Sequence, residues 1–114
     1  MARDLSFWKN KKNNINDDAK VYENLSAGKM LEFVDILPMN EIYNEIKKAF
    51  SGWNWVNEKN FIQDEQMIEV YMTEQFIRFD CHNVAAEHMN AIIDILNKYE
   101  CPLYDSAIST RFGL

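Results

Sequence analysis

The sequence predicts a single α+β domain in which a mainly antiparallel sheet is covered by two or three helices on one face. The length of 114 residues suits one domain. Two segments place apolar residues at helical spacing, around residues 39–50 and 84–99, and the stretch between them alternates apolar and polar residues. Strands joined by short local links pair antiparallel, and helices with one apolar side pack on one face of a sheet.

The N-terminal segment, residues 1–16, is polar and rich in Asn and Lys, and it is predicted to be a flexible basic arm with Phe7 and Trp8 as its large apolar pair. The domain is then expected over residues 17–114. Asp17 and Asp18 predict the start of a short helix that reaches about Ser26, because acidic residues favour a helix N-terminus.

Residues 30–37 are apolar with two interspersed acids, and they are predicted to be a strand or an extended connector that ends at Pro38. The clearest helix of the first half follows, over about residues 39–50. Lys47 and Lys48 lie in its last turns, where the helix dipole favours cations, and Ser51-Gly52 ends it. Its apolar stripe comprises Met39, Ile42, Tyr43, Ile46 and Phe50.

The central part changes to a period of two. Residues 53–55 alternate, residues 57–60 form a turn, and residues 67–73 and 76–82 are predicted to form a β-hairpin linked at Glu74-Gln75. One hairpin face is assigned to the core: Ile68, Val70, Met72, Ile77, Phe79 and Cys81. The other face is expected to be wet or bound to a partner, and it offers Glu69, Tyr71, Phe76, Arg78 and Asp80.

A second strong helix is predicted over about residues 84–99 with Asn83 as its N-cap, followed by two short extended pieces at 103–104 and 108–112. The resulting order of helices and strands resembles a ferredoxin-like split βαβ arrangement. That resemblance concerns architecture, and no function follows from it.

Charge is unevenly distributed along the chain. There are 18 acidic and 12 basic residues, for a formal net charge of −6. Residues 61–114 carry this whole excess, whereas residues 1–60 are neutral overall. An acidic body repels phosphate backbones, so nucleic-acid binding is not expected as the main task, and a basic protein partner is favoured.

Targeting signals are also missing from the pattern. No apolar run reaches the roughly 18 residues of a membrane span, and the first 15 residues contain no apolar core of a secretory signal. We therefore expect a cytoplasmic protein without membrane partners. The bias toward Asn, Lys and Ile is typical of an A+T-rich coding sequence and suggests a bacterial source.

Catalytic and metal chemistry find little support. Cys81 and Cys101 match no zinc or redox spacing and are expected to be thiols. Cys81 and His82 are adjacent on a strand and point to opposite faces, so neither a metal nor another cofactor is expected. Arg78, Asp80 and His82 share one strand face and form the best catalytic arrangement, but no second His or carboxylate pair accompanies them, so ordinary cross-strand charge pairing is the favoured interpretation. The chain is expected to be non-enzymatic.

The aromatic residues near the strands point to protein recognition, or to a face that the N-terminal segment covers. They are Trp53, Trp55, Tyr71, Phe76 and Tyr104. The leading hypothesis is a small acidic protein-binding module, more narrowly an immunity- or antitoxin-type inhibitor of a basic toxin. It predicts a partner-binding surface at Glu69, Tyr71, Phe76, Arg78 and Asp80.

Two alternatives stay open. One is a small-molecule-binding or enzymatic α+β domain in which Arg78 or Arg111 anchors an anion and His82 titrates. The other is a homodimer that uses its own exposed sheet face as the interface.

Overall fold

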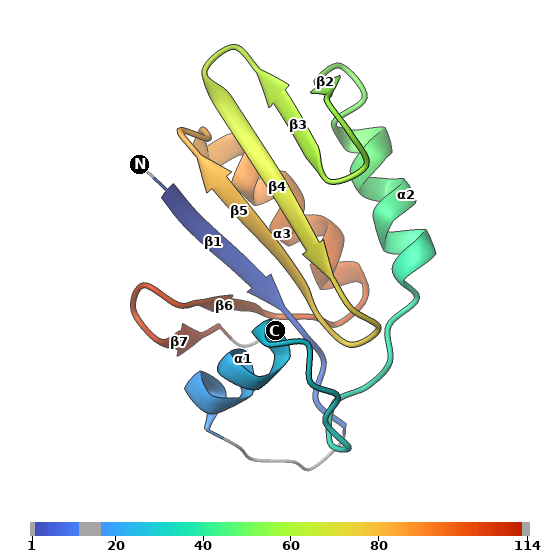
Figure 1. Ribbon diagram of the computed structural model, residues 1–114, viewed down its shortest axis with the longest axis vertical. Coiled ribbons are helices and arrows are strands. Elements are labelled where there is room, and N and C mark those ends of the chain that lie inside the picture. Colours follow the sequence, from blue (N-terminus) through green and yellow to red (C-terminus); the bar gives the residue numbers. More distant parts are fainter. Residues whose placement is uncertain (1, 12–16, 113–114) are drawn as a thin grey trace.

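The computed structural model describes residues 2–11 and 17–112, which form one compact α+β domain with an antiparallel sheet in the order β2-β3-β4-β5-β1-β6-β7 (Figure 1). Seven strands and three helices lie within the described residues. The strands are β1 Ala2–Phe7, β2 Asn54–Trp55, β3 Asn60–Gln63, β4 Gln66–Met72, β5 Ile77–His82, β6 Leu103–Asp105 and β7 Thr110–Arg111. The helices are α1 Asp18–Ser26, α2 Met39–Ala49 and α3 Ala86–Lys98.

The N-terminal segment is where the sequence prediction was wrong. Residues 2–7 form β1, which pairs with both β5 and β6 inside the sheet. Leu5 and Phe7 point to one face and are buried, and Trp8 is fully buried with the other face. Leu5 and Phe7 alternate with polar residues as in a strand, but the Asn- and Lys-rich residues that follow led to the prediction of a flexible arm. The rest of the predicted arm, residues 12–16, lies outside the described residues.

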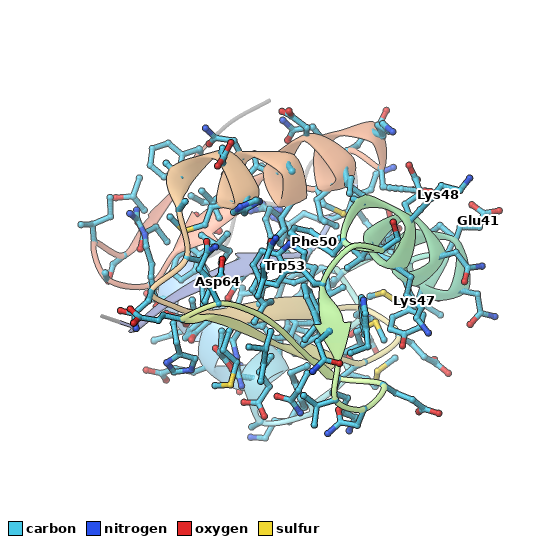
Figure 2. The ribbon with its side chains drawn as sticks, turned by 90° about the horizontal axis from the view of Figure 1, so that it is seen from above. Glu41, Lys47, Lys48, Phe50, Trp53 and Asp64 are labelled. Carbon is cyan, nitrogen blue, oxygen red and sulfur yellow. The ribbon has the colours of Figure 1, made fainter. Side chains whose placement is uncertain are left out.

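The predicted hairpin is confirmed as β4 and β5, whose register pairs Ile68 with Cys81 and Val70 with Phe79. These four residues belong to the main core, which fills the layer between the sheet and helices α2 and α3. Figure 2 shows α2 and α3 on one side of the sheet, with Phe50 pointing between the layers. Burial on this face follows the two-residue period that predicted it.

Two of the expected two or three helices, α2 and α3, share one face of the sheet, whereas α1 packs on the opposite face (Figure 2). Asp17 caps it as predicted, because its carboxylate accepts a hydrogen bond from the Ala19 N–H at 3.0 Å. The apolar side of α1 packs against aromatic residues at one end of the sheet. The second core contains Trp8, Val21, Leu25, Val34, Phe76 and Tyr104.

Helix α3 begins later than its predicted cap. Its N-cap is Ala85, which makes no side-chain capping bond, and Asn83 has a φ of 58° directly after β5. Asn tolerates this left-handed conformation better than most residues, so Asn83 serves the strand-to-helix turn. Residues 30–37 form the predicted connector rather than a strand, with one isolated bridge between Asn10 and Val34.

Candidate functional site

A row of three carboxylates crosses the part of the sheet that α1 leaves open. In the register of the sheet, Glu69 on β4 lies opposite Asp80 on β5, and Asp80 lies opposite Asp4 on β1. Paired residues on adjacent strands point to the same face, so the three side chains form the carboxylate row. They line a depression of about 320 Å³ together with Arg3 and His82.

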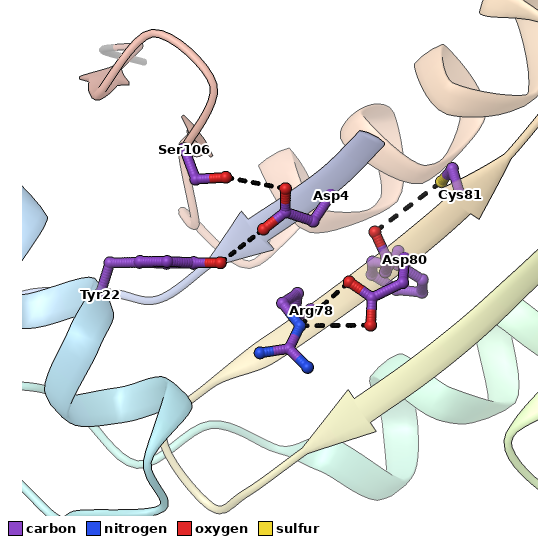
Figure 3. Close-up of polar contacts among 7 residues, drawn as sticks. Asp4, Tyr22, Arg78, Asp80, Cys81 and Ser106 are labelled. Carbon is purple, nitrogen blue, oxygen red and sulfur yellow. Dashed lines mark hydrogen bonds and ion pairs between the residues drawn. The ribbon is translucent and has the colours of Figure 1, made fainter. Parts of the chain in front are cut away.

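Two of the three carboxylates have partners within the protein (Figure 3). Asp4 accepts hydrogen bonds from the Tyr22 hydroxyl at 2.5 Å and the Ser106 hydroxyl at 2.7 Å. Asp80 pairs with the Arg78 guanidinium, Nε to Oδ1, at 3.1 Å. The Glu69 carboxylate is exposed, and it has no hydrogen bond or ion pair with the residues described.

The row therefore keeps an excess of negative charge. Like charges directly opposite each other on neighbouring strands destabilise a sheet, and the Arg78 guanidinium offsets only part of that repulsion. Arg3, which lines the same depression, is paired with Asp105 on β6. Burial and the hydrogen bond to Asp4 raise the pKa of Tyr22. Glu69 presents acceptor oxygens to the solvent, whereas both oxygens of Asp4 and of Asp80 already accept hydrogen bonds within the protein.

Tyr71 connects this row to the end of α1. The Arg78 guanidinium lies 5.0 Å from the centre of the Tyr71 ring, within cation–π distance. On its other side, the Tyr71 hydroxyl lies close to Gly28: a Cβ added there would be 3.5 Å from it. Tyr71 is half-buried, so only part of its ring remains accessible.

Phe76 does not belong to an accessible surface, which corrects the prediction made for it. It points to the predicted face but is fully buried, with its ring centre 6.2 Å from Trp8, 6.2 Å from Tyr22 and 6.1 Å from Tyr71. The burial follows from α1 and Trp8 covering this end of the sheet. Of the five predicted partner-binding residues, the structure groups Glu69, Tyr71, Arg78 and Asp80 on the open face.

The other aromatics singled out from the sequence are not exposed recognition residues either. Tyr104 is buried under α1, and Trp53 is buried on the α2–α3 face against Phe50 and Phe61. Trp55 stacks on Phe61 with ring centres 4.2 Å apart. Asp4 also belongs to the site, because β1 pairs with β5. The sequence analysis missed it because residues 1–16 were predicted to be a flexible arm. The alternation of Asp4 with the apolar residues Leu5 and Phe7 was the signal that could have identified it.

The groups proposed for catalysis are only partly brought together. Arg78, Asp80 and His82 share the open face, and His82 lines the depression with Asp80. Arg111 lies elsewhere: its guanidinium stacks 4.7 Å from the Trp8 ring and donates to the Trp8 carbonyl at 2.5 Å. An anion site that combines Arg111 with His82 is therefore not formed.

The two cysteines are free and buried in the main core, between the sheet and helices α2 and α3. Burial raises the pKa of the Cys81 thiol to about 12 and that of Cys101 to about 11, so both are protonated at neutral pH and poor nucleophiles. In the described part of the chain, no group of three or more His, Cys, Asp or Glu side chains is arranged to hold a metal ion. None of the helices described is long and apolar enough to span a membrane.

Comparison of the sequence with models of known protein families and with curated proteins finds no match.

Proposed function

We propose that this chain is a small acidic protein-binding module, and that the carboxylate row receives basic side chains of a protein partner. The observation that carries the proposal is the alignment of Glu69, Asp80 and Asp4 on three adjacent strands of the open face. Such an arrangement costs stability in the free protein. Lysine or arginine side chains of a partner would relieve the repulsion and gain charge-assisted hydrogen bonds.

The geometry suits fast and selective association. The row lies in the middle of the sheet, so its carboxylates are ordered before binding and lose little freedom on binding. An acidic face speeds encounter with a basic partner and fixes orientation more than it adds affinity. The same field repels phosphate backbones, which speaks against nucleic acid as the ligand.

We infer more narrowly that the chain is an immunity- or antitoxin-type inhibitor that covers a basic toxin surface in the cytoplasm. The support is an acidic domain of −6 formal charge, a rigid charged face and buried, protonated thiols. Free buried thiols suit a reducing compartment. A homodimer through the open face is disfavoured, because it would bring two carboxylate rows together.

We also infer that the centre of the domain is a ferredoxin-like split βαβ arrangement. Four strands lie in the order β4-β5-β1-β6. The chain passes from β1 to β4 through α1, α2, β2 and β3, with β5 between the two strands, and α3 connects β5 to β6 with β1 between them. Insertion of one strand between two strands joined by a helix is the defining feature of that unit. A crystal structure with β1 at an edge of the sheet would overturn this inference.

The small-molecule alternative has one observation in its favour, the depression of about 320 Å³ that contains both His82 and Asp80. Its surroundings are acidic, so the depression favours cationic groups. Those groups are equally the side chains of a basic protein. Titration with free lysine and arginine separates the two cases: millimolar affinity for the free amino acid would favour the small-molecule reading.

The test uses an octalysine peptide as the probe and compares two variants of equal charge. Glu69→Gln with Asp80→Asn removes two of the three negative charges of the row and leaves Asp4. The control pair, Glu58→Gln with Glu65→Gln, removes two exposed acids around the β2–β3–β4 turns. We expect the row variant to weaken binding by about tenfold at low salt and the control by about twofold or less.

Two readouts accompany the affinity. Glu69→Gln alone is expected to raise the free energy of unfolding by about 0.2–1 kcal/mol, because it removes a cross-strand repulsion. Binding should weaken as salt is added, since the interaction is electrostatic. Equal weakening by both charge-matched pairs would show that only net charge matters and would overturn the proposal.

A further inference from the structure

A second exposed feature lies in the connector between α1 and α2. Within the described residues, Ile36 is the most exposed large hydrophobic residue at 68%, and Met30 is exposed at 52%. Together with the partly buried Leu31, they form what we call the connector ridge. Ile36 borders three adjoining depressions of about 370, 360 and 780 Å³ at this end of the domain. An exposed apolar patch bordered by grooves is typical of an interaction site.

The backbone of the ridge is fixed on both sides. The Asp35 N–H donates to the Lys9 carbonyl at 2.7 Å, and the Leu37 N–H donates to the Glu74 carbonyl at 2.8 Å. These bonds tie the residues before and after Ile36 to the segment that follows β1 and to the β4–β5 turn. The backbone on both sides of Ile36 is therefore ordered while its side chain is exposed to the solvent. A partner that binds Ile36 loses little conformational entropy to ordering of this segment.

The buried side chain of Gln75 also fixes the connector, and we call this set of hydrogen bonds the clamp. Its side chain donates to the carbonyls of Leu31 at 2.7 Å and Val34 at 2.8 Å, and it accepts from the Leu31 N–H at 2.8 Å. A buried amide that satisfies three backbone groups of one connector fixes that connector in one conformation. The buried Gln75 side chain thus fixes a segment in which Val34 and Leu37 are buried while Met30 and Ile36 face the solvent.

The rim of the grooves is mainly acidic. The charged residues that line the three depressions are five acids and three bases: Glu32, Asp35, Glu41, Glu74, Glu100, Lys9, Lys11 and Lys98. Two of the bases are held in ion pairs, Lys9 with Glu100 at 2.7 Å and Lys98 with Glu45 at 2.9 Å, so Glu100 is neutralised with Lys9 and four of the rim acids remain outside these pairs. A segment that carries apolar and basic side chains complements this surface in both respects.

We propose that the connector ridge docks an amphipathic, apolar-and-basic helical segment of a protein partner, with Ile36 as the central contact. This inference goes beyond the carboxylate row, and it shares with the proposed function only the premise that the partner is a protein. A second copy of this chain would bring a matching acidic rim against this one. An anionic lipid surface is repelled in the same way, so both are disfavoured.

The probe is a fluorescently labelled 18-residue peptide of leucine and lysine in amphipathic helical order, with a leucine–glutamate peptide of the same pattern for comparison. We expect Ile36→Ser to weaken binding of the leucine–lysine peptide by about tenfold. The matched control is Ile108→Ser, since Ile108 is 60% exposed and lies on the β6–β7 turn. It should change the affinity by about twofold or less.

Further arms identify other occupants and separate this test from that of the carboxylate row. The row variant, Glu69→Gln with Asp80→Asn, should retain most of the affinity for the leucine–lysine peptide. Loss of binding in the row variant but not in Ile36→Ser would overturn the ridge and leave the row standing. Equal binding of both peptides, or a dimer that Ile36→Ser dissociates in light scattering, would also overturn the proposal.

Discussion

Replacement of Gln75 by leucine tests whether this side chain fixes the connector between α1 and α2. The substitution keeps a buried side chain of similar size but removes three hydrogen bonds to Leu31 and Val34. A net contribution of about 1 kcal/mol for each bond gives a loss of about 3 kcal/mol. Val34 is buried, so its carbonyl is left without a partner, and that penalty brings the expected loss to about 4 kcal/mol.

Urea unfolding followed by tryptophan fluorescence measures this change. The control is Gln63→Leu, since Gln63 is exposed on β3, and its free energy of unfolding should stay within about 0.5 kcal/mol of the parent protein. Hydrogen exchange should quicken at residues 31–37 in Gln75→Leu. A loss of less than about 1 kcal/mol for Gln75→Leu would show that the clamp does not hold the connector, and the preorganisation of Ile36 would then be refuted.

Three further outcomes follow from the same contacts. Phe76→Ala should lower the free energy of unfolding by about 3–5 kcal/mol, because it empties the centre of the α1 core; a loss near zero in urea melts would contradict its burial. Cys81 and Cys101 should react with a thiol reagent at pH 8 only when the protein opens, so that reaction as fast as that of free cysteine would be contrary to their burial. The Tyr99 hydroxyl and Lys98 hold the pKa of Glu45 below its usual range, so its contribution to stability is complete at neutral pH and is lost as the pH falls through the lowered pKa. Glu45→Gln should therefore flatten the acid side of the stability profile in pH-dependent melts, and an unchanged slope would count against this coupling.

The main core was predictable because its residues repeat with clear periods. Ile68 and Val70 alternate on β4, and Ile42 and Ile46 recur one helical turn apart on α2, so each pattern fixes which face is buried. The hairpin, α2 and the start of α1 at Asp17 followed from such local signals.

The second core was not predictable in the same way, because its members come from distant parts of the chain. Trp8, Leu25, Phe76 and Tyr104 share no period, and they meet only when β1 enters the sheet between β5 and β6. Local alternation could place Phe76 on a face but could not show that α1 covers that face. The same non-local pairing brings Asp4 beside Asp80. The sequence analysis therefore identified Glu69 and Asp80 but not Asp4 as members of this site.

The most direct test of the carboxylate row is a chemical-shift titration of the ¹⁵N-labelled protein with octalysine at low salt. We predict that the largest amide shifts lie at residues 67–71 on β4, 78–82 on β5 and 2–6 on β1, around Glu69, Asp80 and Asp4. These shifts should fade in the variant that carries Glu69→Gln with Asp80→Asn. Shifts spread evenly over the acidic residues of α2, α3 and the turns, or unchanged in that variant, would contradict the claim that this face binds the partner.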